Sequence, residues 1–163
     1  ESWGFDHGTW GVLQPMYPAT DIPTVQLGLD RTLDADAHLA IGQALAPLRD
    51  EGVLIVGSGN VVHNLSLWRQ SQGTQPDWAL DIGQRVVAAA KAGDHAALTR
   101  FAPDDSAAAM AINSAEHYLP LLYVIGARLP GDEVAVFNDD VDGALSMTSF
   151  LVGDGALLEG VAQ

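Results

Sequence analysis

The histidines are the residues of this chain best suited to acid–base or metal chemistry. Imidazole is the commonest metal ligand in proteins, and its pKa near neutrality suits proton transfer. The chain has no cysteine, which excludes disulfides, thiolate nucleophiles and cysteine-ligated zinc or iron–sulfur sites. The candidates for a functional site are therefore His7, His38, His63, His95 and His117.

His63 has the position most typical of a functional group. It follows the apolar run Gly52–Gly57 after a short Ser-Gly-Asn turn, and open α/β sheets bind their ligands at the carboxyl ends of such strands. This position suits a metal ligand or a proton-transfer group. The structural alternative is a core histidine that hydrogen-bonds to Asn60 or Asn64, because a buried imidazole needs a partner.

His117 and His7 are the next candidates. Glu116 and His117 open a helix that we expect over residues 116–125, where adjacent side chains diverge by about 100°, so that only one of the two would face a metal. A helix-capping pair is the structural alternative for them. His7 lies in a glycine-flanked loop between aromatic residues. Functional groups collect in such loops, but a turn histidine that caps a carbonyl fits the pattern equally well.

The remaining polar motifs favour structural roles. His38 and His95 stand among Asp and Ala at helical positions, and we expect both at the solvated surface. Gly57-Ser58-Gly59 follows a strand but lacks the GxGxxG or Lys-Ser/Thr pattern of a phosphate-binding loop. Ser58 also lacks the spacing of a nucleophile elbow, so a serine hydrolase is poorly supported.

Alternating strands and helices are expected to position these residues. Apolar and β-branched patterning predicts four strands, at residues 22–29, 52–57, 133–137 and 145–152. The second of them has the continuous apolar run of a strand buried on both faces. Capping signals predict helices before and between them: residues 34–49, 76–92 ending at Gly93, 94–101 with Asp94 as the cap, and 116–125. Segment 102–114 is ambiguous. The alternation predicts an α/β fold with a mixed, largely parallel sheet flanked by helices.

Length and charge limit the possible functions. The chain has 163 residues, enough for one domain, which we expect over residues 1–153, with a loose tail over residues 154–163. Its 21 acidic and 7 basic residues give a net charge of −14, which argues against nucleic-acid partners and anionic membrane surfaces. It has no apolar run of the roughly 18–20 residues that cross a bilayer.

Four blocks of the chain share one resemblance. They are 4–10 with 15–27, then 52–64, then 116–123 and 145–150, and they include Gly-Phe-Asp-His-Gly-Thr-Trp and Glu-His-Tyr-Leu-Pro-Leu-Leu-Tyr. In this order they resemble the class III (LigB-type) extradiol ring-cleaving dioxygenases, of the DOPA-dioxygenase subgroup. Several blocks in order are far more specific than any single motif.

The resemblance implies an enzyme that inserts both atoms of O2 beside the hydroxyl groups of a catechol, DOPA-like or other. It implies Fe(II) as the metal for activity, with Zn(II) as the alternative bound metal. His117 is then a metal ligand, and His63 is a ligand or the acid/base group that moves the catechol protons. His7 is close enough in that fold to hydrogen-bond substrate or oxygen intermediates. A cytoplasmic location is expected.

Two features depart from the family pattern. The family's two further metal histidines, in His-Gly-Ser-Pro and Ser-Ala-His-Trp motifs of an N-terminal region, have no counterpart here. The resemblance therefore implies that residues 1–153 are the C-terminal part of a LigB-like catalytic domain. We expect the fold and the metal site to be incomplete without an N-terminal segment or a second chain. In addition, Ile112-Asn113-Ser114-Ala115 stands where the subgroup has His-Pro-Thr-Pro, which puts the usual substrate in doubt.

Two rival hypotheses remain open. A non-catalytic LigB-like binding module or subunit would lack a complete metal site, which agrees with the missing histidines. A zinc hydrolase is the second rival, since histidine-rich sites also suit zinc. Retention of His7, His63 and His117 together favours the dioxygenase, because a binding module does not need all three.

Overall fold

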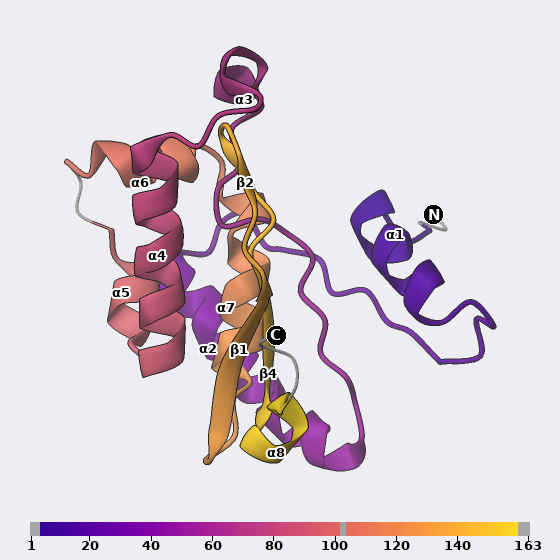
Figure 1. Cartoon of the computed structure of the whole chain (residues 1–163). Helices are drawn as coiled ribbons and strands as arrows, with labels where there is room; N and C mark the ends of the chain where they lie inside the picture. Colours follow the sequence, from indigo (N-terminus) through magenta and orange to yellow (C-terminus); the bar gives the residue numbers. More distant parts are fainter. Residues whose placement is uncertain (1–3, 102–103, 160–163) are drawn as a thin grey trace.

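The computed structural model describes residues 4–101 and 104–159, and Figure 1 shows helix α7 (Leu119–Gly126) near the middle of the molecule, with α1 (His7–Met16) apart from the other helices. Helix α2 (Ala35–Leu45) packs along α7. Helix α4 (Asp77–Ala92) packs against α5 (His95–Thr99), α6 (Ser106–Ala111) and strand β1 (Asp132–Asn138). The described helices are α1 (His7–Met16), α2 (Ala35–Leu45), η1 (Ala46–Glu51), α3 (Leu65–Ser71), α4 (Asp77–Ala92), α5 (His95–Thr99), α6 (Ser106–Ala111), η2 (Ala115–His117), α7 (Leu119–Gly126) and α8 (Gly155–Leu158). None of these helices is both long and apolar enough to cross a bilayer.

Glycines allow α2 and α7 to approach closely. A Cβ atom at Gly42 would lie 2.6 Å from the Tyr123 carbonyl oxygen, and one at Gly126 would lie 2.6 Å from the Leu39 carbonyl oxygen. Each helix therefore has a glycine where the backbone of the other helix passes. Any larger residue there would collide with that backbone. This close approach fixes α7, whose first turn follows His117.

The strands form two small antiparallel sheets. Strand β1 (Asp132–Asn138) pairs with β4 (Ser149–Asp154), with Val134 opposite Val152. Strand β2 (Val141–Asp142) pairs with β3 (Leu145–Ser146). The prediction of a largely parallel sheet is wrong, although the mixed α/β character is confirmed. These strands are joined by short connections, which reverse the chain and therefore pair strands antiparallel.

The two strands expected at 22–29 and 52–57 are extended chain without a ladder partner among the described residues. The expected burial of 52–57 on both faces is wrong: Leu54 is 58% exposed and Val56 is 44% exposed. Within 22–29, Val25 is 92% exposed. The apolar pattern is that of a buried strand, but a strand is buried only when neighbouring strands and helices cover it.

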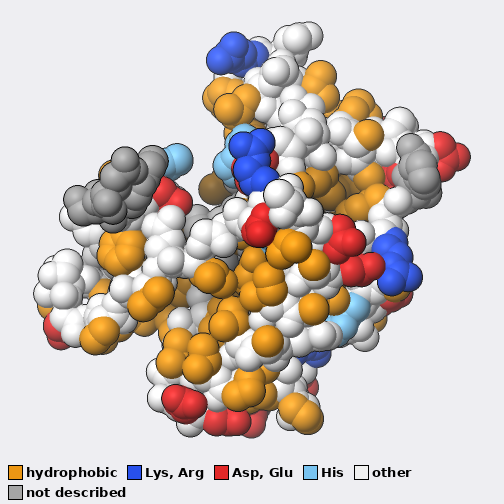
Figure 2. Space-filling model, turned by 180° about the vertical axis from the view of Figure 1, so that it is seen from behind, with side chains coloured by type: hydrophobic (Ala, Val, Ile, Leu, Met, Phe, Trp, Pro, Cys, Tyr) orange, Lys and Arg blue, Asp and Glu red, His pale blue; other side chains and the backbone are white. Residues whose placement is uncertain are grey.

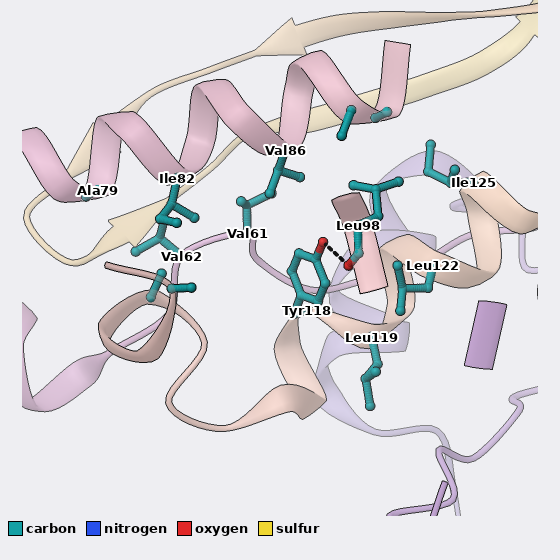
Figure 3. Packing of buried hydrophobic residues seen from close by; sticks show 14 of the residues in the cluster. Val61, Val62, Ala79, Ile82, Val86, Leu98, Tyr118, Leu119, Leu122 and Ile125 are labelled. Carbon is teal, nitrogen blue, oxygen red and sulfur yellow. Dashed lines mark hydrogen bonds between the residues drawn. The ribbon is translucent and has the colours of Figure 1, made fainter. Parts of the chain in front are cut away.

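The hydrophobic core lies between α4, α5, α7 and the segment that leads to His63 (Figure 3). The Tyr118 hydroxyl donates a 2.8 Å hydrogen bond to the Leu98 carbonyl oxygen. Burial raises the pKa of Tyr118, which keeps this donor protonated. The largest fully buried apolar side chains are Val62, Ile82, Val86, Leu98, Leu122 and Ile125.

Local capping signals are confirmed. The carboxylate of Asp34 accepts a hydrogen bond from the Ala37 amide at 2.8 Å, and the carboxylate of Asp94 accepts one from the Ala97 amide at 3.0 Å. Gly93 ends α4 with a φ of 68°, the left-handed conformation that favours glycine. These signals act within one turn, so they hold whatever the distant packing is.

Other boundaries differ from the sequence prediction. The strand expected over 145–152 is divided into β3 and β4. The helix expected over 116–125 begins as the 3-10 turn η2 and continues as α7, and the ambiguous segment 102–114 contains α6. The expected tail contains the short helix α8, while residues 160–163 lie outside the described part of the chain.

Candidate functional site

The rings of His63 and His117 are stacked. Their centroids are 3.5 Å apart and their planes differ by 17°. His63 stands just before α3, and His117 ends η2. The fold therefore brings together two of the three histidines that the sequence selects for this site, from segments far apart in the chain.

Backbone contacts on both sides hold His63. Its amide donates to the Ala111 carbonyl oxygen at 3.0 Å, and His63 forms an isolated antiparallel bridge with Leu145. On the neighbouring residue, the Val62 amide donates to the buried Ser146 hydroxyl at 3.3 Å, and the Ser146 amide donates to the Val62 carbonyl oxygen at 3.0 Å. The His63 backbone is thus clamped between α6 and β3.

His117 is held by the turn that precedes His63. The Asn60 amide donates to the His117 carbonyl oxygen at 2.8 Å. The next residue, Tyr118, is anchored in the core by its hydroxyl. The His117 carbonyl group is therefore hydrogen-bonded to the segment that leads to His63, and the residue that follows His117 is fixed in the core.

The interpretation of His63 as a core histidine bound to an asparagine is not supported. The Asn60 side-chain amide donates to the Ser146 carbonyl oxygen at 2.7 Å. The Asn64 side chain donates to the Met110 carbonyl oxygen at 2.9 Å and accepts from the Leu67 amide at 3.1 Å as the N-cap of α3. Both asparagines therefore hold backbone segments together instead of holding the imidazole.

The surroundings of His63 favour its neutral form. Burial lowers the pKa of His63, and the neighbouring His117 lowers it further, while Glu116 opposes both effects. A neutral imidazole has a free nitrogen lone pair, which a metal ligand or a general base requires. The exposed Glu116 has a pKa below its ordinary value, mainly because its own backbone amide hydrogen-bonds to the carboxylate.

His7 is the exposed first residue of α1, and the prediction of a loop there is wrong. The Asp6 carboxylate caps this helix by accepting a 2.8 Å hydrogen bond from the Thr9 amide. Figure 1 shows α1 to one side of the other helices, and it has no buried residue. A Cβ atom at Gly8 would lie 3.3 Å from the Ser58 hydroxyl, so the start of α1 reaches the turn before His63.

The prediction that His38 is a surface histidine is wrong. Its side chain is completely buried on α2, and Nδ1 lies 2.8 Å from the Tyr123 hydroxyl on α7. Its Nε2 has no hydrogen-bond partner among the residues that the structure describes. The Asp and Ala neighbours suggested solvent, but His38 lies on the α2 face that α7 covers. His95, expected at the surface, is partly buried as the first residue of α5.

The donor set fits part of a metal centre. Two imidazoles side by side suit Zn(II) or non-haem Fe(II). Non-haem iron in a facial site takes three protein ligands, and no group of three metal-binding side chains converges within 4–101 and 104–159. His63 and His117 would hold such a metal together with a donor that those residues do not supply.

Hydrophobic side chains cover a broad area of the surface (Figure 2). The unpaired segments contribute some of the most exposed apolar residues, including Ile22, Val25, Leu27 and Leu54. A groove of about 110 Å³ lies between residues 53–55, α7 and Val152 of β4. An exposed apolar area of this kind is typical of a surface that another polypeptide segment covers.

Comparison with known proteins finds relatives that match most of the chain. The chain is 41% identical over 160 residues to a protein of Escherichia coli K12 named 4,5-DOPA dioxygenase extradiol, with 94% of this chain and 58% of that protein covered. It is 34% identical to the protein of the same name from Beta vulgaris, with 87% of this chain and 53% of that protein covered. The crystal structure of an uncharacterized Escherichia coli K12 protein superposes with a TM-score of 0.81 at 41% identity, covering 92% of this chain and 63% of that one.

The chain therefore spans a little over half the length of these two curated relatives. Residues 1–142 match the family described as the catalytic LigB subunit of aromatic ring-opening dioxygenase. With this match over most of its residues, the chain belongs to the LigB family of aromatic ring-opening dioxygenases.

Proposed function

We propose that this chain carries two metal ligands of an extradiol dioxygenase that opens the ring of a catechol. The stacked pair of His63 and His117 is the observation on which this proposal rests. Two imidazoles from distant segments are brought into contact, and the asparagines beside them bind other groups. The membership of the chain in the LigB family supplies the class of reaction.

The reaction breaks the ring carbon–carbon bond next to the diol. Both oxygen atoms of O2 enter the product, one in the new aldehyde and one in the new carboxylate, so no further reductant is needed. A non-haem metal bound at the site would act as a Lewis acid toward the catechol oxygens and leave positions open for substrate and gas.

The chain's own residues would bind and orient the substrate. His63 acts as a ligand or as the group that accepts a catechol proton, since its imidazole is only partly exposed and has a neighbour that disfavours its charged form. His117 acts as a ligand. His7, at the start of α1, is proposed to hydrogen-bond to substrate once α1 and the Ser58 turn close the site.

A DOPA-like catechol is the proposed substrate class, because the relatives carry that name. Ile112 is partly buried against the core and offers no polar group where the subgroup has a histidine. Comparing turnover of DOPA with that of an unsubstituted catechol tests whether the amino-acid part of the substrate contributes to binding here.

Additional polypeptide is proposed to complete the site. The extended segments 22–29 and 52–57 have apolar side chains and no ladder partner among the described residues. Unpaired strand edges pair with other chain segments. A segment that pairs there, in the same polypeptide or another, would also bring the third metal ligand.

Oxygen uptake with a catechol tests the proposal. The chain is assayed with and without added ferrous iron, alone and together with the part of the Escherichia coli relative that lies outside the match. We expect ring cleavage only when iron and the complementing segment are both present. Metal binding without oxygen uptake in any combination would favour the alternative, a non-catalytic binding module, which the two-histidine donor set also fits.

A further inference from the structure

Asn60 connects the three segments that meet at the histidine pair. Its backbone amide donates to the His117 carbonyl oxygen at 2.8 Å. Its side-chain amide donates to the Ser146 carbonyl oxygen at 2.7 Å, and Nδ2 also lies 3.9 Å from the Met147 sulfur. One residue thus joins the turn before His63 to η2 and to β3.

Ser146 continues this connection to the residue next to His63. It is completely buried, its hydroxyl accepts from the Val62 amide, and its own amide donates to the Val62 carbonyl oxygen. The path from His117 to His63 therefore runs through Asn60 and Ser146 by hydrogen bonds of ordinary length. The other contact of this region with the core leads away from His63, because the Tyr118 hydroxyl donates to the Leu98 carbonyl oxygen.

We infer that Asn60 is a positioning residue, which sets the stacked arrangement of His63 and His117 through its bonds to His117 and Ser146. This inference deepens the proposed function and rests on it only for the consequence for metal binding. Asn60 does not touch the rings through a described hydrogen bond, so it acts through the backbones that carry them.

The physical reason lies in the side-chain donor. If the Asn60 side-chain amide is removed, the part-buried Ser146 carbonyl oxygen loses its hydrogen-bond donor. Leaving such a group unpaired costs enough free energy to displace a short segment. The displaced residue would be Asn60, whose backbone holds His117. Outer-shell partners of metal ligands typically affect metal affinity by about 10–100-fold.

Asn60→Leu, which keeps the size of the side chain but removes the donor, tests the inference. Stacked imidazoles give nuclear Overhauser contacts between ring protons and mutual ring-current shifts, assigned by loss of each signal in His63→Ala and His117→Ala. We expect these contacts and shifts in the unaltered chain and their loss in Asn60→Leu while the protein remains folded. If the metal proposal also holds, Zn²⁺ titrated into the same samples binds at least about tenfold more weakly to the variant.

Asp94→Ala is the matched control. It removes the helix cap of α5, at a cost of about 1 kcal/mol, without touching the histidine pair, and should keep the ring contacts. Unchanged ring contacts in Asn60→Leu would overturn the inference. Loss of the contacts in both variants would also overturn it, because general destabilisation would then be the cause. Weak Zn²⁺ binding in all samples would count against the proposed metal site, while the ring contacts still decide the role of Asn60.

Discussion

Gly59 lies so close to His117 that a Cβ atom added to it would collide with the His117 carbonyl oxygen. This position requires glycine because another backbone passes there. A backbone cannot move aside as a flexible side chain can. The turn before His63 and the end of η2 are therefore in direct backbone contact at the candidate site.

Gly59→Ala should accordingly separate the two segments. We expect a loss of about 2 kcal/mol in the free energy of unfolding, within the usual range for overpacking, together with weaker Zn²⁺ binding. Gly28→Ala is the control, since a Cβ atom there has no neighbour within 4 Å. Equal unfolding curves for the two variants would show that the contact can relax without cost.

His63→Ala should remove activity without removing the fold. Loss of a general acid–base group lowers the rate by about 10²–10⁴, and the His63 side chain is only partly buried. His38→Ala should show the reverse: the buried imidazole leaves a cavity beside Tyr123, which costs about 2 kcal/mol or more. Ring-cleavage rates of the completed enzyme and thermal melting of both variants distinguish the roles. A strongly lowered melting temperature in His63→Ala would restore the core-histidine interpretation.

His117→Ala should lower metal content far more than Glu116→Gln. The His117 ring faces His63, whereas the Glu116 carboxylate is exposed and is hydrogen-bonded by its own backbone amide. Metal content per protein is measured on both purified variants after loading with the same metal. The reverse order would transfer the ligand role to Glu116.

The ion pair of Arg49 with Asp132 should make stability depend on acidic pH. Burial raises the pKa of Asp132, but the hydrogen bonds from Arg49 and the Leu129 amide outweigh it, so the pKa is lowered overall. A carboxyl group whose pKa is lower in the folded state stabilises the protein above its unfolded pKa of about 3.9, and this contribution is lost as pH falls through the folded pKa.

Asp132→Asn should therefore reduce the free energy of unfolding at pH 7 by about 3 kcal/mol, because it leaves Arg49 partly buried without its partner, and should flatten the dependence on pH below about 5. Denaturant unfolding between pH 3 and pH 7 measures both effects. Asp81→Asn is the control, since its pair with Arg85 is exposed and worth less than about 1 kcal/mol. If the free energy of unfolding of Asp132→Asn falls with decreasing pH as steeply as that of the unaltered chain, the role given to Asp132 is wrong.

Local features of the fold were predictable from the sequence. The caps Asp34 and Asp94 and the helix end at Gly93 depend on neighbours within one turn, and they form as predicted. Sheet direction was not predictable, because it depends on which distant segments pair. The run 52–57 has the composition of a buried strand, but its burial requires neighbours that the described residues do not provide.

The histidine pair was only partly predictable. The position of His63 after an apolar run and of His117 at a helix start selected both residues, but their stacking depends on Gly59 and Asn60 meeting η2. No periodic pattern links Asn60 to Ser146, so the sequence alone did not indicate their contact. His38 was misplaced because its neighbours in sequence are Asp and Ala, whereas the buried face of α2 is made by His38, Leu39 and Gly42.

Anomalous diffraction from crystals of this chain soaked with Zn²⁺ tests the central claim most directly. The claim is that His63 and His117 are joint ligands of one metal ion. It predicts a single strong peak at the zinc edge, about 2.0–2.1 Å from one ring nitrogen of each histidine, and no such peak in His117→Ala. A peak on surface carboxylates with none at the histidine pair would contradict the claim.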